Sequence, residues 1–150
     1  MTPHIRQATE ADLTAVLELY AQPDMDKGQT LTLDQAQKLL QTFALYPSYG
    51  LFVACSPAAS AQVVGSYALL IMHNLAHRGS PSAIVEDVVV ASAHQRQGVG
   101  QAMMRHAQSL AQKAGCYKLA LSSNLSRTQA HAFYRSLGFE QHGLSFRMEL

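Results

Sequence analysis

The stretch IVEDVVVASAHQRQGVGQAMMRHA, residues 84–107, decides the fold. It begins with an apolar, β-branched run, continues as a polar loop that carries glycine, and ends in apolar residues at helical spacing. We therefore expect a buried strand, a loop and a helix, in that order. A glycine-bearing loop lets the backbone approach a ligand, and the free N–H groups of a helix's first turn point toward it. The stretch predicts a site for an anion such as a pyrophosphate.

The whole chain has the length and composition of one globular domain, which we assign to residues 1–150. Apolar residues make up 48% of it, and 11 basic against 10 acidic side chains give a formal net charge of +1. Because the basic residues are dispersed, we expect no nucleic-acid partner, and no apolar run predicts a membrane span. The start, MTPHIRQATEADL, lacks the apolar core of a signal peptide, so we expect a cytoplasmic protein.

Several elements are expected before the quoted stretch. A first strand covers residues 4–8, and capping-box patterns start two helices near Thr9 and Thr32. Two β runs, residues 50–55 and 62–72, follow, and the Ser/Pro/Ala-rich turn between them indicates an antiparallel hairpin. The two helices and their connection precede the main sheet, where a substrate-facing flap can be built.

The strand expected at residues 83–90 carries Glu86 and Asp87 in its middle, where acids are unfavourable without a partner or a purpose. Strand alternation places Glu86 on the same face as Val88 and Val90. Asp87 is then expected on the opposite face, which makes it the weaker candidate for chemistry. The two acids are a second sign of a functional site.

The quoted stretch and the residues after it predict the second half of the fold. We expect a helix over residues 98–113, a strand over 117–122, a short helix that starts near Ser126 and ends at Gly138, and a last strand over 144–149. The complete order is β-α-α-β-β-β-α-β-α-β. It predicts an α+β or mixed α/β layer built on one sheet.

Two motifs in this half resemble those of the GNAT superfamily, the acyl-CoA-dependent N-acetyltransferases. Residues 95–100, QRQGVG, resemble its Gln/Arg-x-x-Gly-x-Gly/Ala signature, and residues 130–139, AHAFYRSLGF, resemble its second motif, A-x-x-F-Y-x-x-x-G-F. A helix and a strand separate the two, as in the family. The resemblance implies a central mixed, mostly antiparallel sheet flanked by helices, with a V-shaped splay between its fourth and fifth strands. It also implies a homodimer, which is the family habit.

Shorter likenesses concern the acceptor. Residues 84–90 and 115–118 are similar to stretches of glucosamine-phosphate N-acetyltransferases, and residues 126–131 resemble bacterial aminoalkylphosphonate-type acetyltransferases. Both imply a small-molecule amine as substrate, including amines that carry an anionic phosphoryl or phosphonate group. One position departs from the family, because many members have Asn where Arg127 stands. Either Asn124 moves in from the loop, or Arg127 meets the cofactor or substrate differently.

The resemblance implies acetyl-CoA as co-substrate and no metal. The N–H groups of residues 97–101 would cradle the pyrophosphate, Arg96 would add a charge, and the backbone of residues 88–90 would pair with the pantetheine arm. The cofactor-binding residues are thus Val88, Val89, Val90, Gln95, Arg96, Gln97, Gly98, Val99, Gly100, Gln101, Arg127 and Ala130.

Acetyl transfer also requires a base for the amine and an acid for the departing thiolate. The family places the hydroxyl of its motif tyrosine near the cofactor sulfur, so Tyr134 is the candidate acid. Glu86 is the candidate base, directly or through a water, because a buried strand would raise its pKa. The alternatives are core packing for Tyr134 and a structural ion pair for Glu86.

The predicted function is therefore acetyl transfer from acetyl-CoA to the primary amine of a small molecule. The alternatives are a non-catalytic acyl-CoA-binding sensor and a protein or peptide N-acetyltransferase. A mononucleotide-binding protein is disfavoured, because the patterns G-x-x-x-x-G-K-[ST] and G-x-G-x-x-G are missing.

Overall fold

A computed structural model describes residues 2–150 of the chain. Internal contacts divide the chain into two compact units, one that ends at Ala120 and one that spans Leu121–Leu150. Each unit is described by itself. No helix among these residues is both long and apolar enough to cross a membrane.

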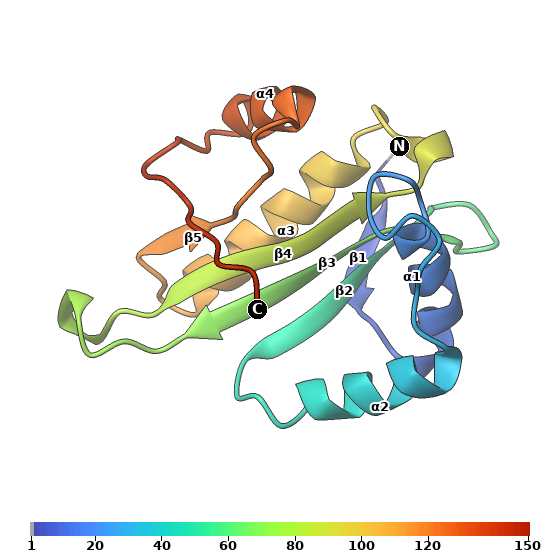
Figure 1. Cartoon of the computed structure of the whole chain (residues 1–150), viewed down its shortest axis with the longest axis horizontal. Coiled ribbons are helices and arrows are strands. Elements are labelled where there is room, and N and C mark those ends of the chain that lie inside the picture. The colour runs from blue at the N-terminus through green and yellow to red at the C-terminus, as the bar shows by residue number, and fades with distance from the viewer. Residues whose placement is uncertain (1) are drawn as a thin grey trace. The chain divides into compact units, whose positions relative to one another are not determined.

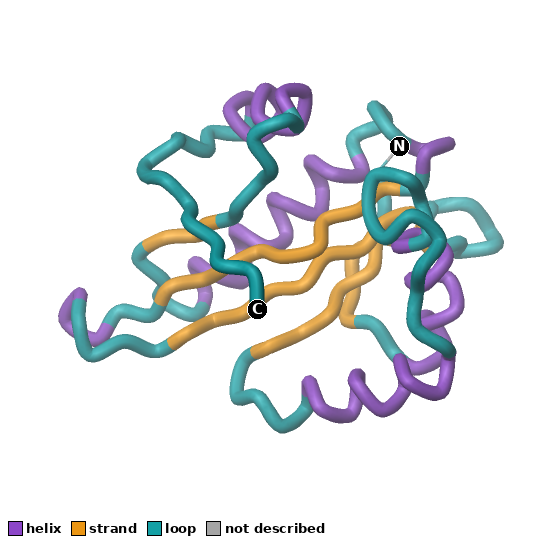
Figure 2. The backbone as a smooth tube through the Cα atoms, in the orientation of Figure 1, coloured by secondary structure: helices purple, strands orange, loops and turns teal. Residues whose placement is uncertain are grey.

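The first unit is built on one five-stranded sheet (Figure 1, Figure 2). Its strands, in spatial order, are β1 (His4–Gln7), β2 (Tyr49–Cys55), β3 (Val63–Met72), β4 (Ser82–Val90) and β5 (Lys118–Ala120). The first four strands pair antiparallel, and β5 pairs parallel with β4. The predicted mixed, mostly antiparallel sheet of an α+β fold is confirmed.

The α-helices of this unit are α1 (Leu13–Tyr20), α2 (Leu33–Phe43) and α3 (Val99–Lys113), and short 3-10 turns lie at Glu10–Asp12, His77–Gly79 and Ser92–His94. Helix α2 begins with the predicted capping box. The hydroxyl of Thr32 accepts from the N–H of Gln35, and the Gln35 side chain accepts from the N–H of Thr32. Before α1, the carboxylate of Asp12 accepts from the N–H of Thr9 at 2.8 Å. Both predicted helix starts are confirmed.

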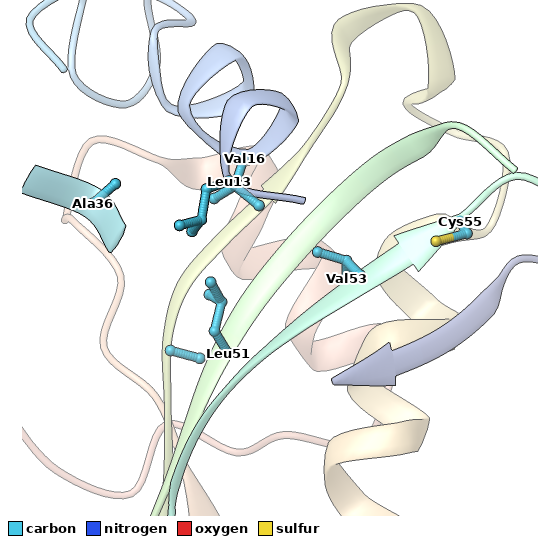
Figure 3. Close-up of a cluster of buried hydrophobic side chains, with 7 residues drawn as sticks. Leu13, Val16, Ala36, Leu51, Val53 and Cys55 are labelled. Carbon is cyan, nitrogen blue, oxygen red and sulfur yellow. The ribbon is translucent and has the colours of Figure 1, made fainter. Parts of the chain in front are cut away.

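Helices α1 and α2 cover one face of the sheet, where a cluster of buried side chains joins them to β2 and β3 (Figure 3). The cluster consists of Leu13, Val16, Ala36, Leu51, Val53, Cys55 and Ala68. Residues that pair directly across antiparallel strands share a face, so Leu51, Ala68 and Glu86 form one row. This row extends from the cluster to a carboxylate in the middle of β4.

Helix α3 covers the opposite face and begins close to the sheet at Gly65 of β3. A Cβ added at Gly65 would lie 3.0 Å from Val99 Cγ1, 3.1 Å from the Val89 carbonyl oxygen and 3.2 Å from Met103 Cε. Val99 and Met103 are buried. The missing side chain at Gly65 therefore fixes how closely the first turn of α3 approaches the sheet.

Replacing Gly65 by alanine is expected to lower the free energy of unfolding by about 1–3 kcal/mol, because the added methyl group overpacks the contact between α3 and β3. Urea unfolding followed by circular dichroism measures this change. Gly143→Ala is the control, since a Cβ at Gly143 meets nothing within 4 Å. Equal stability of the two variants would contradict the tight approach of α3.

The second unit contains α4 (Thr128–Ser136), which is followed by Gly138 in the predicted left-handed conformation, with a φ of 95°. The predicted last strand at residues 144–149 is wrong, because none of these residues forms a strand. Its alternating apolar side chains, Leu144, Phe146 and Met148, are exposed. A strand needs a ladder partner, and no strand within residues 2–150 pairs with this segment.

Candidate active site

The β3–β4 register shifts at the two acids of β4. On one side of the shift, Ala68 of β3 pairs with Glu86. On the other side Ser66 pairs with Val89, so β3 advances by two residues where β4 advances by three. Asp87 has a φ of 54°, a left-handed conformation that accommodates the extra residue. Strand β4 is therefore bulged at Asp87.

The bulge changes which side chains share a face. Ser66 and Ala68 lie two apart in β3 and so lie on the same side of the sheet. Their partners, Val89 and Glu86, share that side. Val90, one residue further, faces the α3 side. The prediction that Glu86 shares a face with Val90 is wrong, because the extra residue shifts the alternation by one.

Asp87 also lies on the Glu86 side of the sheet, not on the opposite side as predicted. Burial, and then the negative charge of Asp87, raise the pKa of Tyr20 in α1 to about 12. Burial and the same charge raise the pKa of Tyr49, which shares the face of Leu51 in β2. Both tyrosines belong to the α1–α2 side, so Asp87 is turned toward that side too. The left-handed backbone of the bulge allows this.

Both acids are solvent-exposed, yet their pKa values are raised. Partial burial raises the pKa of Glu86, and repulsion from Asp87 adds to it. Partial burial and then repulsion from Asp26, in the loop after α1, raise the pKa of Asp87. Neither Glu86 nor Asp87 forms an ion pair within residues 2–150, so the structural-pair alternative for Glu86 finds no support. The three carboxylates make this region negative.

One edge of β4 is left open by β5. The parallel pairing ends with Ile84 and Ala120, so the residues of β4 after Ile84, including Val88 to Val90, have no partner in β5. The N–H of Ala91 donates toward β3, to the carbonyl oxygen of Val64, at 2.8 Å. Because successive residues of an extended strand face alternate sides, the backbone groups of Val90 face the open edge. A ligand with amide groups can pair there as an added strand would.

The loop between β4 and α3 presents backbone N–H groups. Gly98 precedes α3 with a φ of 84°, and no side chain caps the helix. A Cβ added at Gly98 meets nothing within 4 Å, so the space beside it is open. Arg96 also has a left-handed φ, 61°, which a residue other than glycine adopts only with some strain. The N–H groups of the first turn are free to meet an anion.

The predicted cofactor residues of this unit differ in exposure. Gln95, Arg96 and Gln97 are exposed, whereas the side chains of Val89 and Val99 are buried. The backbone of Val89 is directed toward β3, so of these two residues only Val99, at the start of α3, can offer its N–H to a ligand. The structure thus brings the open edge of β4, the two acids and the loop together in one unit. No three His, Cys, Asp or Glu side chains gather as a metal site among residues 2–150.

The second unit holds Arg127, Ala130 and Tyr134 at α4. Burial raises the pKa of the Tyr134 hydroxyl, and the positive charge of Arg127 opposes the rise. The Asn124 Oδ1 accepts from the N–H of Ser126 at 2.9 Å and from its hydroxyl at 2.8 Å. This oxygen is therefore used in the turn before α4, and Arg127 is the residue whose charge reaches Tyr134.

Residues near the acids that no motif predicts are Tyr20, Asp26 and Tyr49. The sequence pattern places Tyr20 on the apolar face of its helix and gives no hint of a role for Asp26 or Tyr49. Tyr20 and Asp26 come near β4 because α1 and the loop after it pack against the sheet, and Tyr49 is the first residue of β2, in the same sheet. Spacing within one sequence carries no signal for such contacts.

The mixed sheet, the bulged fourth strand with its open edge and the uncapped helix after a glycine loop define a class of protein. Residues 13–139 match the model of the acetyltransferase (GNAT) family. The chain belongs to this family, and it is an N-acetyltransferase by class.

Particular relatives agree with this assignment. A solved structure from Agrobacterium tumefaciens str. C58, named as an acetyltransferase, is 32% identical to this chain in sequence. The two structures superpose with a TM-score of 0.88, and the match covers 98% of this chain and 99% of that chain. Aminoglycoside N(6')-acetyltransferase type 1 of Acinetobacter haemolyticus is 28% identical over 92% of this chain and 91% of its own length. Probable glucosamine 6-phosphate N-acetyltransferase 2 of Oryza sativa subsp. japonica is 30% identical over 67% of this chain and 60% of its own length. The resemblance drawn from the two motifs is confirmed.

Proposed function

We propose that the protein transfers an acetyl group from acetyl-CoA to the primary amine of a small, positively charged molecule. The observation that carries the proposal is the bulge of β4. It places Glu86 next to Asp87, whose charge reaches Tyr20 and Tyr49 on the same side of the sheet, in the strand whose edge β5 leaves open. The acids can supply both a proton acceptor and a counter-charge to an amine.

The loop and the open edge fit acetyl-CoA, which supplies the acetyl group as a thioester. The uncapped first turn of α3 offers N–H groups to the pyrophosphate, and Gly98 leaves room for it. Arg96 adds a positive charge. The backbone of Val88 and the N–H of Val90 offer strand-like hydrogen bonds to the amides of the pantetheine arm. We also propose that Arg127 and Ala130, at the start of α4, contact acetyl-CoA. The family resemblance supports this.

Two side chains move protons in this proposal. Glu86 accepts a proton from the amine, directly or through a water, as the new C–N bond forms. Its raised pKa makes it a stronger base than an ordinary carboxylate. Tyr134 donates its hydroxyl proton to the sulfur as the C–S bond breaks. A tyrosine hydroxyl is protonated at neutral pH, and burial raises the pKa of Tyr134 above its ordinary value of 10.0.

The charge around the acids favours a cationic acceptor. The negative charge of Asp87 raises the pKa of Glu86, and that of Asp26 raises the pKa of Asp87. No positively charged side chain lowers either pKa. The named relatives point in two directions, since an aminoglycoside carries several amines and glucosamine 6-phosphate carries a phosphate. The carboxylates would repel a phosphate. We therefore favour an acceptor with two or more ammonium groups over a phosphorylated or phosphonylated amine.

Release of CoA, measured with acetyl-CoA and a panel of amines, tests the proposal. The panel contains an aminoglycoside, glucosamine and glucosamine 6-phosphate, because the last two differ only in the phosphate. We expect kcat/KM to fall in that order. The highest kcat/KM for glucosamine 6-phosphate would contradict a cationic acceptor. A rise in Tm with acetyl-CoA but no turnover of any amine, peptides included, would favour the sensor alternative.

Gly98→Asn is expected to weaken acetyl-CoA binding at least about tenfold. Asparagine tolerates the left-handed backbone that Gly98 adopts, so the loop persists while the new side chain fills the space beside the N–H groups. Isothermal titration calorimetry measures the affinity. Gly115→Asn is the matched control, since Gly115 lies just beyond the other end of α3, has a φ of 77° and is equally open. Equal affinities would remove Gly98 from the cofactor site.

We also propose that the protein is a homodimer, that it is cytoplasmic and that residues 1–150 form a single domain. Light scattering of the purified protein tests the dimer, since the chain has a mass of 16.3 kDa. A mass near that of one chain would contradict it.

A further inference from the structure

Gln22, in the loop after α1, bonds to the end of β4. Its Nε2 donates to the carbonyl oxygen of Val90 at 3.1 Å, and its Oε1 accepts from the N–H of Ser92 at 2.9 Å. These partners lie 68 and 70 residues further along the chain. One side chain therefore joins the loop after α1 to the start of the loop that leads to α3.

Both bonds lie on the edge of β4 that β5 leaves open. The N–H of Ala91 donates to β3, and the carbonyl of Val90, which belongs to the same trans peptide, therefore points away from β3. The N–H of Ser92 bonds to the same Gln22 carboxamide as this carbonyl. The carboxamide of Gln22 thus bonds to this edge as a neighbouring strand would. Gln22 donates to the carbonyl of Val90 and accepts from the N–H of Ser92. The N–H of Val90 is directed to the same edge.

The loop that Gln22 anchors also carries Asp26. The N–H of Asp26 donates to the carbonyl oxygen of Tyr20 at 2.9 Å, and the N–H of Met25 donates to that of Gln22 at 3.0 Å. These bonds fold the loop back onto the end of α1. Burial, and then repulsion from Asp26, raise the pKa of Asp87 in the bulge. Fixing Gln22 to β4 therefore also holds the Asp26 carboxylate near the bulged acids.

We infer that Gln22 is a positioning residue for acetyl transfer, whose carboxamide fixes the open edge of β4 at Val90 and holds the Asp26 loop beside the bulge. The inference rests on the proposed function, because it assigns that edge to acetyl-CoA. Gln22 moves no proton. It holds Asp26, which comes from a distant part of the chain, beside the open edge and the acids of β4.

Two substitutions at Gln22 test the inference. Gln22→Leu removes both hydrogen bonds, whereas Gln22→Glu keeps the acceptor for Ser92 and loses the donor to Val90. Protonation of the introduced carboxyl group restores a donor, so the defect of Gln22→Glu should shrink as the pH falls. Gln29→Leu and Gln29→Glu are the matched controls, because Gln29 lies exposed near the end of the same loop.

Two measurements read out the variants. Hydrogen exchange of the Ser92 amide, measured without ligand, should be about tenfold faster in Gln22→Leu than in Gln29→Leu, since its acceptor is gone. Acetyl-CoA affinity should fall about tenfold in Gln22→Leu, and in Gln22→Glu at pH 8, relative to the matched controls. It should recover in Gln22→Glu alone as the pH falls toward about 4.3, the ordinary pKa of a glutamic acid side chain. A general loss of stability would produce no such recovery.

Unchanged Ser92 exchange and unchanged affinity in Gln22→Leu would overturn the inference and leave the proposed function standing. Equal affinity of Gln22→Glu and Gln29→Glu at every pH would overturn it as well. Failure of the unaltered protein to bind acetyl-CoA would contradict the proposed function itself, and the role of Gln22 with it. The binding of the unaltered protein thus separates the two failures.

Discussion

Replacing Tyr134 by phenylalanine is expected to lower kcat by about 10²- to 10⁴-fold, the usual contribution of a positioned general acid. The variant keeps the ring, which packs against Phe133 and Phe139 at ring-centre distances of 5.3 and 5.8 Å. It removes only the hydroxyl that we propose as the proton donor to the departing sulfur. Acetyl-CoA affinity should therefore stay within about twofold of that of the unaltered protein. Steady-state kinetics and isothermal titration calorimetry measure the two quantities.

Tyr117→Phe is the control for this substitution. Tyr117 also stacks on a neighbouring ring, that of His77, and has no part in the proposed site, so both quantities should be unchanged. The pH dependence provides a second check. Burial raises the pKa of Tyr134, so the loss of kcat at high pH should begin above the ordinary value of 10.0. An unchanged kcat in Tyr134→Phe would remove Tyr134 from the mechanism.

Replacing Glu86 by glutamine is expected to lower kcat/KM about 10²-fold or more at neutral pH. A base must be ionised to accept a proton, so activity rises with pH as Glu86 loses its own proton. Burial and the charge of Asp87 raise the pKa of Glu86 above its ordinary value of 4.5, which moves this rising limb to higher pH. In the Glu86→Gln variant, activity should no longer rise with the ionisation of Glu86 and should change with pH only as the substrate amine titrates. A pH–rate profile measures it.

Two further variants define what Glu86 does. Glu18→Gln, exposed on α1, is the control and should leave the profile unchanged. Asp87→Asn removes a counter-charge, so it should raise the KM for the amine and keep the rising limb. If Glu86→Gln also raises only KM and keeps the limb, Glu86 binds the amine and another group accepts its proton.

The face predicted for Asp87 shows where spacing within a sequence stops being informative. The start of α2 at Thr32 and the left-handed Gly138 after α4 depend on residues within one turn, and the structure has both as predicted. A bulge adds one residue to a strand, and a pattern of period two looks regular across it. The tolerance of aspartate for a left-handed backbone is the one local property that fits a bulge here.

Other parts of the site depend on contacts between distant residues. Gln22 and Asp26 lie in a segment that the sequence marks only as a break between two helices, and packing brings both of them to β4. The strand predicted at residues 144–149 failed for the converse reason. Its alternation is a local property, but a strand also requires a partner, which no local pattern specifies.

The central claim is that the open edge of β4 and the loop before α3 bind acetyl-CoA. A titration of the ¹⁵N-labelled protein with acetyl-CoA, followed by NMR of the backbone amides, tests it most directly. We predict the largest shifts at Val90, Gly98 and Gly100, and no comparable shifts in β1. No shift at high acetyl-CoA concentration, or shifts confined to residues outside β4 and the loop, would contradict the claim.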